Sequence, residues 1–417
     1  MSAEAIPIRR IFRVVNGGTP TAAEDNWGGD VPWATPVDLN SADGVLNSTQ
    51  RTLTRQGALS GSSIVGSDSI LISTRAPIGY VARVTAPMAF NQGCRALVPL
   101  RRVDARFFVY QLSAMTQQLQ SRGMGSTFQE LSGGALAEVP VNVPPLEEQR
   151  RIADFLDAET SRVDAMLHTR QLQRRAFEER ELSYISATLA GFDQTGPRHL
   201  SPWPWLGKIP QSWKIGPVYA YYNVQLGKML NPERTIGQNL RPYMRNANIH
   251  WYDVDHSDVA AMNFDPNERR RYELRSGDLL VCEGGAGVAE SAVWSGDFGE
   301  CYYQKSLHRV RPRTDLPVEW LMYWLRLAKH VGMLDAEGNL STIPHLTGEQ
   351  IRRMRIPVPD DASERVRSLG EMISANASVR SALDAADRLS QERRQALITA
   401  AVTGQLDVTT ARSGVGA

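Results

Sequence analysis

Cysteine is scarce in this sequence and follows no metal-binding or disulfide pattern. The three cysteines, Cys94, Cys282 and Cys301, form no CxxC pair and no Cys/His motif. A zinc site or a disulfide framework needs clustered, regularly spaced cysteines. We therefore expect three free thiols, buried as small apolar side chains, and no resident metal.

Long apolar runs are also absent. No stretch approaches the roughly 18 apolar residues that a transmembrane helix needs. The first ten residues, MSAEAIPIRR, lack the apolar core of a secretory signal. The sequence thus predicts no membrane association and a cytoplasmic location.

Motifs for nucleotide binding, zinc-dependent hydrolysis and adenine methylation are missing as well. There is no GxxxxGK[ST] phosphate loop, no HExxH and no NPPY-like tetrapeptide of the kind expected in an adenine methyltransferase. The single glycine cluster, residues 283–287, is not followed by the helix and acidic residue of a dinucleotide site, so we interpret it as a turn. The sequence predicts a protein without catalytic residues or a cofactor of its own.

Excess charge of either sign is lacking too. The 46 Lys and Arg residues face 45 Asp and Glu residues, for a formal net charge of +1. A nucleic-acid reader with this balance must gather its basic groups on one face or gain affinity from a partner. Only five of the 46 basic residues are lysine; arginine suits guanine edges and phosphate, although an arginine-rich genome would produce the same bias.

What the sequence does contain is a duplication. Residues 126–145, STFQELSGGALAEVPVNVPP, align without gaps on residues 341–360, STIPHLTGEQIRRMRIPVPD. Residues 69–73 likewise match 278–282, and the glycine after each long helical segment recurs as Gly191 and Gly404. Ordered matches at nearly constant offsets indicate two copies of one unit.

Each copy ends in a long helical segment. Residues 146–190 contain no proline or glycine, and apolar residues recur there at spacings of three and four; residues 363–402 follow the same pattern. Such a helix spans roughly 65 Å and needs a partner for its apolar stripe. The partner is either the other helix or a helix of another protein, and both are compatible along different stretches.

These features predict an α+β protein. We expect two globular mixed α/β domains, residues 1–145 and 214–360, separated by long helices at 146–191 and 361–405 that pack as an antiparallel coiled coil. Short core helices are expected at 106–120 and 317–329. Residues 192–213 form a linker whose Trp203, Trp205 and Trp213 should fasten it to a surface, and residues 406–417 form a disordered tail.

Six segments in a fixed order, spread over nearly the whole chain, form a recognisable set: NGGTP (16–20), DVPWATPVDL (30–39), ILISTRAPIG (70–79), VPVNVPPLEEQRRIADFLDAETSRVDAML (139–167), WLGKIPQSW (205–213) and RRQALITAAVTGQLDV (393–408). This ordered set resembles the specificity subunits of type I restriction-modification systems. The second half departs from the family pattern, because it has neither GGTP nor the arginine of STRAPIG, and the lead-in WLGKIPQSW does not precede the first domain.

The resemblance implies a non-catalytic subunit with two target recognition domains that read a bipartite, asymmetric site on double-stranded DNA. It implies two methyltransferase subunits, which bind S-adenosylmethionine and methylate adenine, and motor-nuclease subunits that use ATP and magnesium. Two other interpretations stay open: a coiled-coil adaptor with protein-binding domains, and a self-contained modification enzyme, against which the missing motifs count.

Candidate DNA contacts are polar residues in predicted loops. Arginine pairs with guanine, and asparagine or glutamine with adenine. The alternatives are turn chemistry for Asn and Ser, and strand-end solvation for Lys305. We interpret the run Glu268 to Arg271 as a solvated face or a phosphate contact and not as base readout. The candidates are Thr19, Arg75, Asn91, Gln92, Arg95, Ser126 and Thr127 in the first domain, and Arg245, Asn246, Asn248, Gln304, Lys305, Ser341 and Thr342 in the second.

Overall fold

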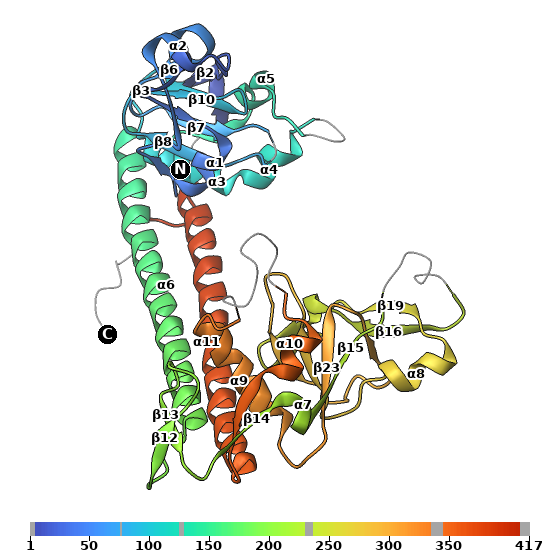
Figure 1. Cartoon of the computed structure of the whole chain (residues 1–417). Helices are drawn as coiled ribbons and strands as arrows, with labels where there is room; N and C mark the ends of the chain where they lie inside the picture. Colours follow the sequence, from blue (N-terminus) through green and yellow to red (C-terminus); the bar gives the residue numbers. More distant parts are fainter. Residues whose placement is uncertain (1–4, 76, 125–128, 230–236, 335–344, 409–417) are drawn as a thin grey trace. The chain divides into compact units, whose positions relative to one another are not determined.

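A computed structural model describes residues 5–75, 77–124, 129–229, 237–334 and 345–408 (Figure 1). The chain divides into two compact units. The first comprises residues 1–171 and 383–417, and the second residues 172–382. Within the described residues, no helix is long and apolar enough to cross a membrane.

The first unit is built on two sheets. The larger has the strand order β2-β10-β7-β8-β4, and the smaller has the order β5-β3-β9-β6. Helix α3 packs on the larger sheet through Phe107 and Phe108, both fully buried. The elements are β1 (Ala5–Pro7), η1 (Ile8–Arg10), β2 (Phe12–Asn16), η2 (Glu24–Asn26), β3 (Trp27–Ala34), α1 (Pro36–Ser41), β4 (Val45–Leu46), β5 (Arg51–Leu53), α2 (Arg55–Gly61), β6 (Ser63–Val65), β7 (Ile70–Ser73), β8 (Val81–Val84), β9 (Met88–Phe90), β10 (Cys94–Pro99), α3 (Ala105–Ala114), α4 (Thr116–Ser121), α5 (Gly133–Ala137), β11 (Pro140–Asn142) and α6 (Leu146–Leu189), of which α6 continues into the second unit.

The second unit has a four-stranded sheet of order β15-β23-β20-β21 and a three-stranded sheet of order β19-β16-β22. Helix α9 carries the fully buried Trp320 and Trp324. The elements are β12 (Arg198–Leu200), β13 (Lys208–Pro210), β14 (Lys214–Pro217), α7 (Val218–Tyr221), β15 (Tyr222–Leu226), β16 (Leu240–Met244), η4 (Asn246–Asn248), β17 (Ile249–His250), β18 (Asp253–Val254), β19 (Ala260–Asn263), α8 (Pro266–Tyr272), β20 (Leu279–Cys282), β21 (Ser291–Val293), β22 (Tyr302–Tyr303), β23 (Leu307–Pro312), α9 (Val318–His330), α10 (Gly348–Arg353), β24 (Arg355–Val358) and α11 (Ala362–Val402), of which α11 continues into the first unit.

The strand orders reproduce the duplication. The antiparallel order β2-β10-β7-β8 of the first unit recurs as β15-β23-β20-β21 in the second. The pair β1-β11 recurs as β14-β24, and the parallel pair β3-β9 recurs as β16-β22. Conservation of both antiparallel and parallel pairings confirms that the chain contains one fold twice.

Helices α6 and α11 lie side by side and run antiparallel in each unit (Figure 1). In the first unit, Arg394 of α11 pairs with Asp164 of α6. In the second unit, Tyr184 of α6 bonds to Ser368 of α11. Each helix ends before a glycine of positive φ, Gly191 and Gly404, as predicted. The predicted antiparallel helix pair is therefore confirmed.

The tryptophan-rich linker is fastened to the second unit, as its composition predicted. Trp203 and Trp205 contact Trp324 of α9 at ring-centroid distances of 4.6 and 5.2 Å. Trp213 packs edge-on against Trp320, 6.1 Å away. Residues 409–417 of the predicted disordered tail lie outside the described residues.

Candidate nucleic-acid interface

A tight turn at the end of the first strand of each large sheet frames both candidate sites. At Gly17, a Cβ atom would lie 2.0 Å from the backbone oxygen of Asn91, and at Gly227 one would lie 2.2 Å from that of Gln304. The next residue donates its backbone N–H to the last residue of a strand in the smaller sheet: Gly18 to the Phe90 carbonyl of β9 at 2.9 Å, and Lys228 to the Tyr303 carbonyl of β22 at 3.1 Å. The second domain thus keeps the first glycine of NGGTP, which the sequence comparison had missed.

Five polar side chains follow one another beside this turn in the first domain. Thr19 donates a hydrogen bond to the side chain of Gln92. Arg95 Nη1 donates to the Gln92 carbonyl at 3.0 Å, and Arg95 Nη2 lies 3.3 Å from Glu130 Oε1. Arg75 Nε lies 3.2 Å from the other Glu130 oxygen. The structure therefore links four predicted residues in one chain of contacts, and two of them, Arg75 and Arg95, meet the carboxylate of Glu130, which was not predicted.

The other first-domain candidates fall outside this cluster. The Asn91 side chain accepts the backbone N–H of Gly93 at 3.0 Å, which is the turn chemistry weighed as its alternative. Ser126 and Thr127 lie outside the described residues, as do Ser341 and Thr342 of the second domain.

A second polar cluster occupies the matching place in the second domain. Asn246 Nδ2 donates to the Gly284 carbonyl at 2.7 Å, and its backbone N–H donates to Ser306 Oγ at 3.2 Å. Gln304 Nε2 donates to the same hydroxyl at 3.0 Å. Lys305 is exposed beside Gln304. Three predicted residues are thus neighbours around Ser306.

A carboxylate accompanies this cluster as well. Burial raises the pKa of Glu283, and the nearby His345 and Lys305 partly offset the shift. The Glu283 carbonyl accepts the backbone N–H of Leu346 at 2.6 Å. Glu283 is therefore fixed at the edge of the cluster with its side chain near two basic groups.

Asn248 does not belong to this surface. Its side chain is 1% exposed, and its Nδ2 donates to the carbonyls of Asp255 and Asp258 at 3.0 and 2.9 Å. Its Oδ1 accepts the N–H of Arg245, just as the buried Asp38 accepts that of Thr35 in the first domain. This matched capping arrangement corrects the prediction that Asn248 is available to read bases.

Arg245 stays partly exposed, and its guanidinium pairs with the carboxylate of Asp258. Lys228, whose side chain is only 3% exposed, was not among the predicted residues. Lys228 Nζ donates to the Asn263 carbonyl at 2.7 Å, pairs with Glu268 and lies 4.8 Å from the Phe264 ring centroid. It therefore fastens the second large sheet's turn to β19 and α8.

The two clusters occupy equivalent backbone positions. An isolated bridge joins Arg75 to Glu130 in the first domain, and another joins Gly284 to His345 in the second. In the first domain the Leu131 N–H donates to the Thr74 carbonyl at 2.8 Å, which matches the Leu346 to Glu283 bond. One backbone frame thus presents different side chains in the two domains.

No catalytic constellation appears among the described residues. They contain no group of three His, Cys, Asp or Glu residues placed to hold a metal. The three cysteines are free and buried, as predicted, and burial raises the pKa of each thiol to about 12. Burial lowers the pKa of His308 to about 4, so its imidazole is neutral. The glycine cluster at 283–287 forms the expected turn.

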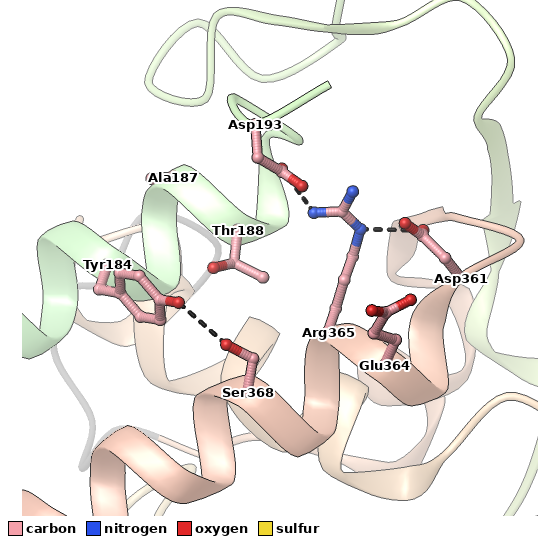
Figure 2. A pocket seen from close by; sticks show the side chains of 8 residues that line it. All are labelled: Tyr184, Ala187, Thr188, Asp193, Asp361, Glu364, Arg365 and Ser368. Atoms are coloured by element: carbon pink, nitrogen blue, oxygen red, sulfur yellow. Dashed lines mark hydrogen bonds and ion pairs between the residues drawn. The ribbon is translucent and has the colours of Figure 1, made fainter. Parts of the chain in front are cut away.

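A pocket of about 330 Å³ in the second unit has a structural explanation (Figure 2). Arg365, whose side chain is 6% exposed, donates to Asp361 at 2.9 Å and to Asp193 at 2.7 Å. Tyr184 and Ser368 bond beside it at 3.0 Å. The charges of Arg365, Asp193 and Asp361 pair with one another. We therefore interpret the pocket as a structural junction between the end of α6 and the start of α11.

Parts of this sequence match known proteins. Residues 4–173 match the family model described as the type I restriction modification DNA specificity domain. An alignment of 255 residues, 60% of this chain, gives 31% identity with the type I restriction enzyme MjaIX specificity subunit of Methanocaldococcus jannaschii. Over these stretches the chain is similar to the specificity subunits of type I restriction-modification systems.

The alignment with this M. jannaschii specificity subunit spans 56% of that relative's length. Type I restriction enzyme EcoprrI specificity subunit of Escherichia coli is 28% identical over 31% of this chain and 33% of its own.

Two solved structures share the fold over nearly the whole chain. A chain from a structure of a type I R-M system, described for its complex assembly and conformational transition, has a TM-score of 0.72 at 17% identity and covers 97% of this chain and 98% of its own. The HsdS subunit from Thermoanaerobacter tengcongensis has a TM-score of 0.50 at 18% identity, over 96% of this chain and 97% of its own. The two-domain, two-helix fold class predicted from the sequence is confirmed.

Proposed function

We propose that this chain is the cytoplasmic DNA-specificity subunit of a type I restriction-modification complex and performs no chemistry itself. Each domain reads one half of a bipartite, asymmetric site on double-stranded DNA. The observation that carries this proposal is the repeated backbone frame with different side chains at one isolated bridge, which we call the tip of each domain. The tip is formed by Arg75 and Glu130 in the first domain and by Gly284 and His345 in the second. Two different tips on one frame suit two different half-sites.

The helix pair provides surface for partner subunits. Apolar side chains remain exposed on it: Met166 and Leu389 are 52% and 66% exposed in the first unit, and Leu172 and Val379 are 50% and 38% exposed in the second. Exposed apolar residues on a helix suit contact with helices of another protein. With a net charge of only +1, tight DNA binding then depends on those partners.

We propose that these partners are two methyltransferase subunits and, for restriction, motor-nuclease subunits. The methyltransferase subunits would bind S-adenosylmethionine and methylate adenine, and the motor-nuclease subunits would use ATP and magnesium. This chain would select the site at which they act.

The test is methylome sequencing of cells that co-express this chain with a candidate type I methyltransferase subunit from the same genome. The proposal predicts one methylated motif with two unlike half-sites and a spacer of fixed length. A coiled-coil adaptor with protein-binding domains predicts no motif in the same experiment. Binding of S-adenosylmethionine by the purified chain alone would instead favour a self-contained modification enzyme.

A further inference from the structure

The carboxylate of Glu130 lies between two arginines at the tip of the first domain. Its Oε2 is 3.2 Å from Arg75 Nε, and its Oε1 is 3.3 Å from Arg95 Nη2. The backbone of Glu130 exchanges two hydrogen bonds of 3.0 Å with Met124, and Leu131 bonds to Thr74, so its position is set by strand-like pairing. Glu130 is therefore a fixed acceptor for both arginines.

The two arginines differ in freedom. The Arg95 side chain is 13% exposed, and its Nη1 donates to the carbonyls of Gln92 and Cys94 at 3.0 and 3.2 Å. The Arg75 side chain is 50% exposed and meets Glu130 through Nε. Its two terminal nitrogens have no partner within the part of the chain that the structure describes. Arg95 thus anchors the carboxylate, while Arg75 can offer a two-nitrogen fork to a ligand.

The second domain lacks all three charged groups at once. By strand register and bridges, Arg75, Glu130 and Arg95 correspond to Gly284, His345 and His308. His308 is buried and bonds through Nε2 to the Leu346 carbonyl at 3.0 Å, so it does not substitute for a surface arginine. A set present as a whole in one domain and absent from the other belongs to specificity and not to the shared frame.

We infer that Glu130 is a positioning residue that orients Arg75 to read a guanine in the first half-site. The inference rests on the proposed function. A guanidinium fork matches the N7 and O6 acceptors of guanine, and a carboxylate on its Nε edge fixes the plane of that fork. Phosphate contact would need charge but not this orientation, because phosphate contacts carry no base identity.

The experiment is methylome sequencing of the assembled complex with Arg75→Ala, Glu130→Gln and, as matched control, Glu138→Gln. Glu138 also pairs with an arginine of the first domain, Arg9 at 3.1 Å, with both side chains about half exposed. The second half-site serves in each variant as the internal measure of folding and assembly.

We expect Arg75→Ala to reduce the preference for guanine at one first-half-site position by roughly 5- to 150-fold. Glu130→Gln should reduce it by roughly fivefold or more at that same position. Glu138→Gln should leave both half-sites unchanged, and all variants should keep the second half-site.

Two results would overturn the inference: an unchanged base preference in either Arg75→Ala or Glu130→Gln, or a uniform loss of methylation with unaltered preference. The second result would assign Arg75 to phosphate. A wild-type chain that directs no motif would overturn the proposed function itself, and the inference with it, so the two failures are distinguishable.

Discussion

The two domains agree where the backbone is crowded and differ where side chains reach the surface. Gly17 and Gly227 occupy equivalent turns in the two domains, and each faces a backbone oxygen that leaves no space for a Cβ atom. At the tips, by contrast, Arg75 becomes Gly284 and Glu130 becomes His345. The difference teaches that the frame is constrained by sterics, while the tip is free to change with the sequence that each domain reads.

The junctions between domain and helix differ in a second, instructive way. In the first unit the buried Gln149 of α6 accepts the N–H of Asp104 at 2.9 Å and donates to the Pro144 carbonyl at 2.8 Å. The matching residue before α9 is Pro317, which has no N–H to donate. Near the start of α11, the buried Arg365 pairs with Asp193 and Asp361. Neutral hydrogen bonds therefore hold the junction in the first unit, and ion pairs hold it in the second.

The largest expected effect is on stability, and it comes from an arginine of α11 whose ion pairs differ in burial between the two units. In the second unit, fully buried Glu181 pairs with Arg380 at 2.5 Å. Arg380→Met should cost about 3 kcal/mol of unfolding free energy, because it leaves a buried carboxylate without its cation. In the first unit, Arg394 pairs with the more exposed Asp43 and Asp164, so Arg394→Met should cost about 1 kcal/mol or less. Denaturant titrations would measure both, and equal costs would contradict the comparison.

Next in size is the shared turn. Gly17→Ala and Gly227→Ala should each cost about 1–3 kcal/mol, since the added methyl group meets a backbone oxygen. Gly66→Ala is the matched control, because nothing lies within 4 Å of the Cβ position there. Hydrogen exchange would locate the loss, in the first unit for Gly17 and in the second for Gly227. If only one of the two variants destabilised its unit, the frames would not be equivalent.

The smallest effect concerns acid and the charged junction. The Arg365 guanidinium holds the pKa of Asp193 below its ordinary value. The ionised carboxylate therefore stabilises the fold above its ordinary pKa, and this contribution is lost as pH falls through the lowered value. Asp193→Asn should cost less than about 1 kcal/mol at pH 7, because the side chain is well exposed, and this cost should shrink below about pH 4.

The control for the acid effect lies in the first unit. Gln149→Leu removes neutral hydrogen bonds, so its cost should not follow the titration of a carboxylate. Denaturant titrations from pH 7 to pH 3 would compare the two variants. A cost of Asp193→Asn that grew on acidification would contradict the ionic account.

Much of the fold was predictable because local signals were strong. The stretch without proline or glycine predicted a helix over residues 146–190, and α6 spans Leu146–Leu189. The helix predicted at 106–120 is instead broken at Met115 into α3 and α4. The parallel pairs β3-β9 and β16-β22 join segments far apart in the sequence, so no local pattern could indicate them.

The site was predictable only in part. Residue type identified Arg75 and Gln92, but it also selected Asn248, whose amide is used inside the protein. Glu130 was missed because the candidates were chosen by the base pairings of Arg, Asn and Gln, and because Glu130 is far in sequence from Arg95, which it contacts. A usable signal was present: Glu130 aligns with His345 inside the otherwise similar segments 126–145 and 341–360.

The central claim is that two domains of one backbone fold recognise different half-sites. Its most direct test is a chain in which residues 5–144 replace residues 215–359. The boundaries follow the strand register, in which β1 and β11 correspond to β14 and β24. Co-expressed with the methyltransferase, this chain should direct methylation to a site that contains the first half-site twice and lacks the second. Retention of the original second half-site would contradict the account.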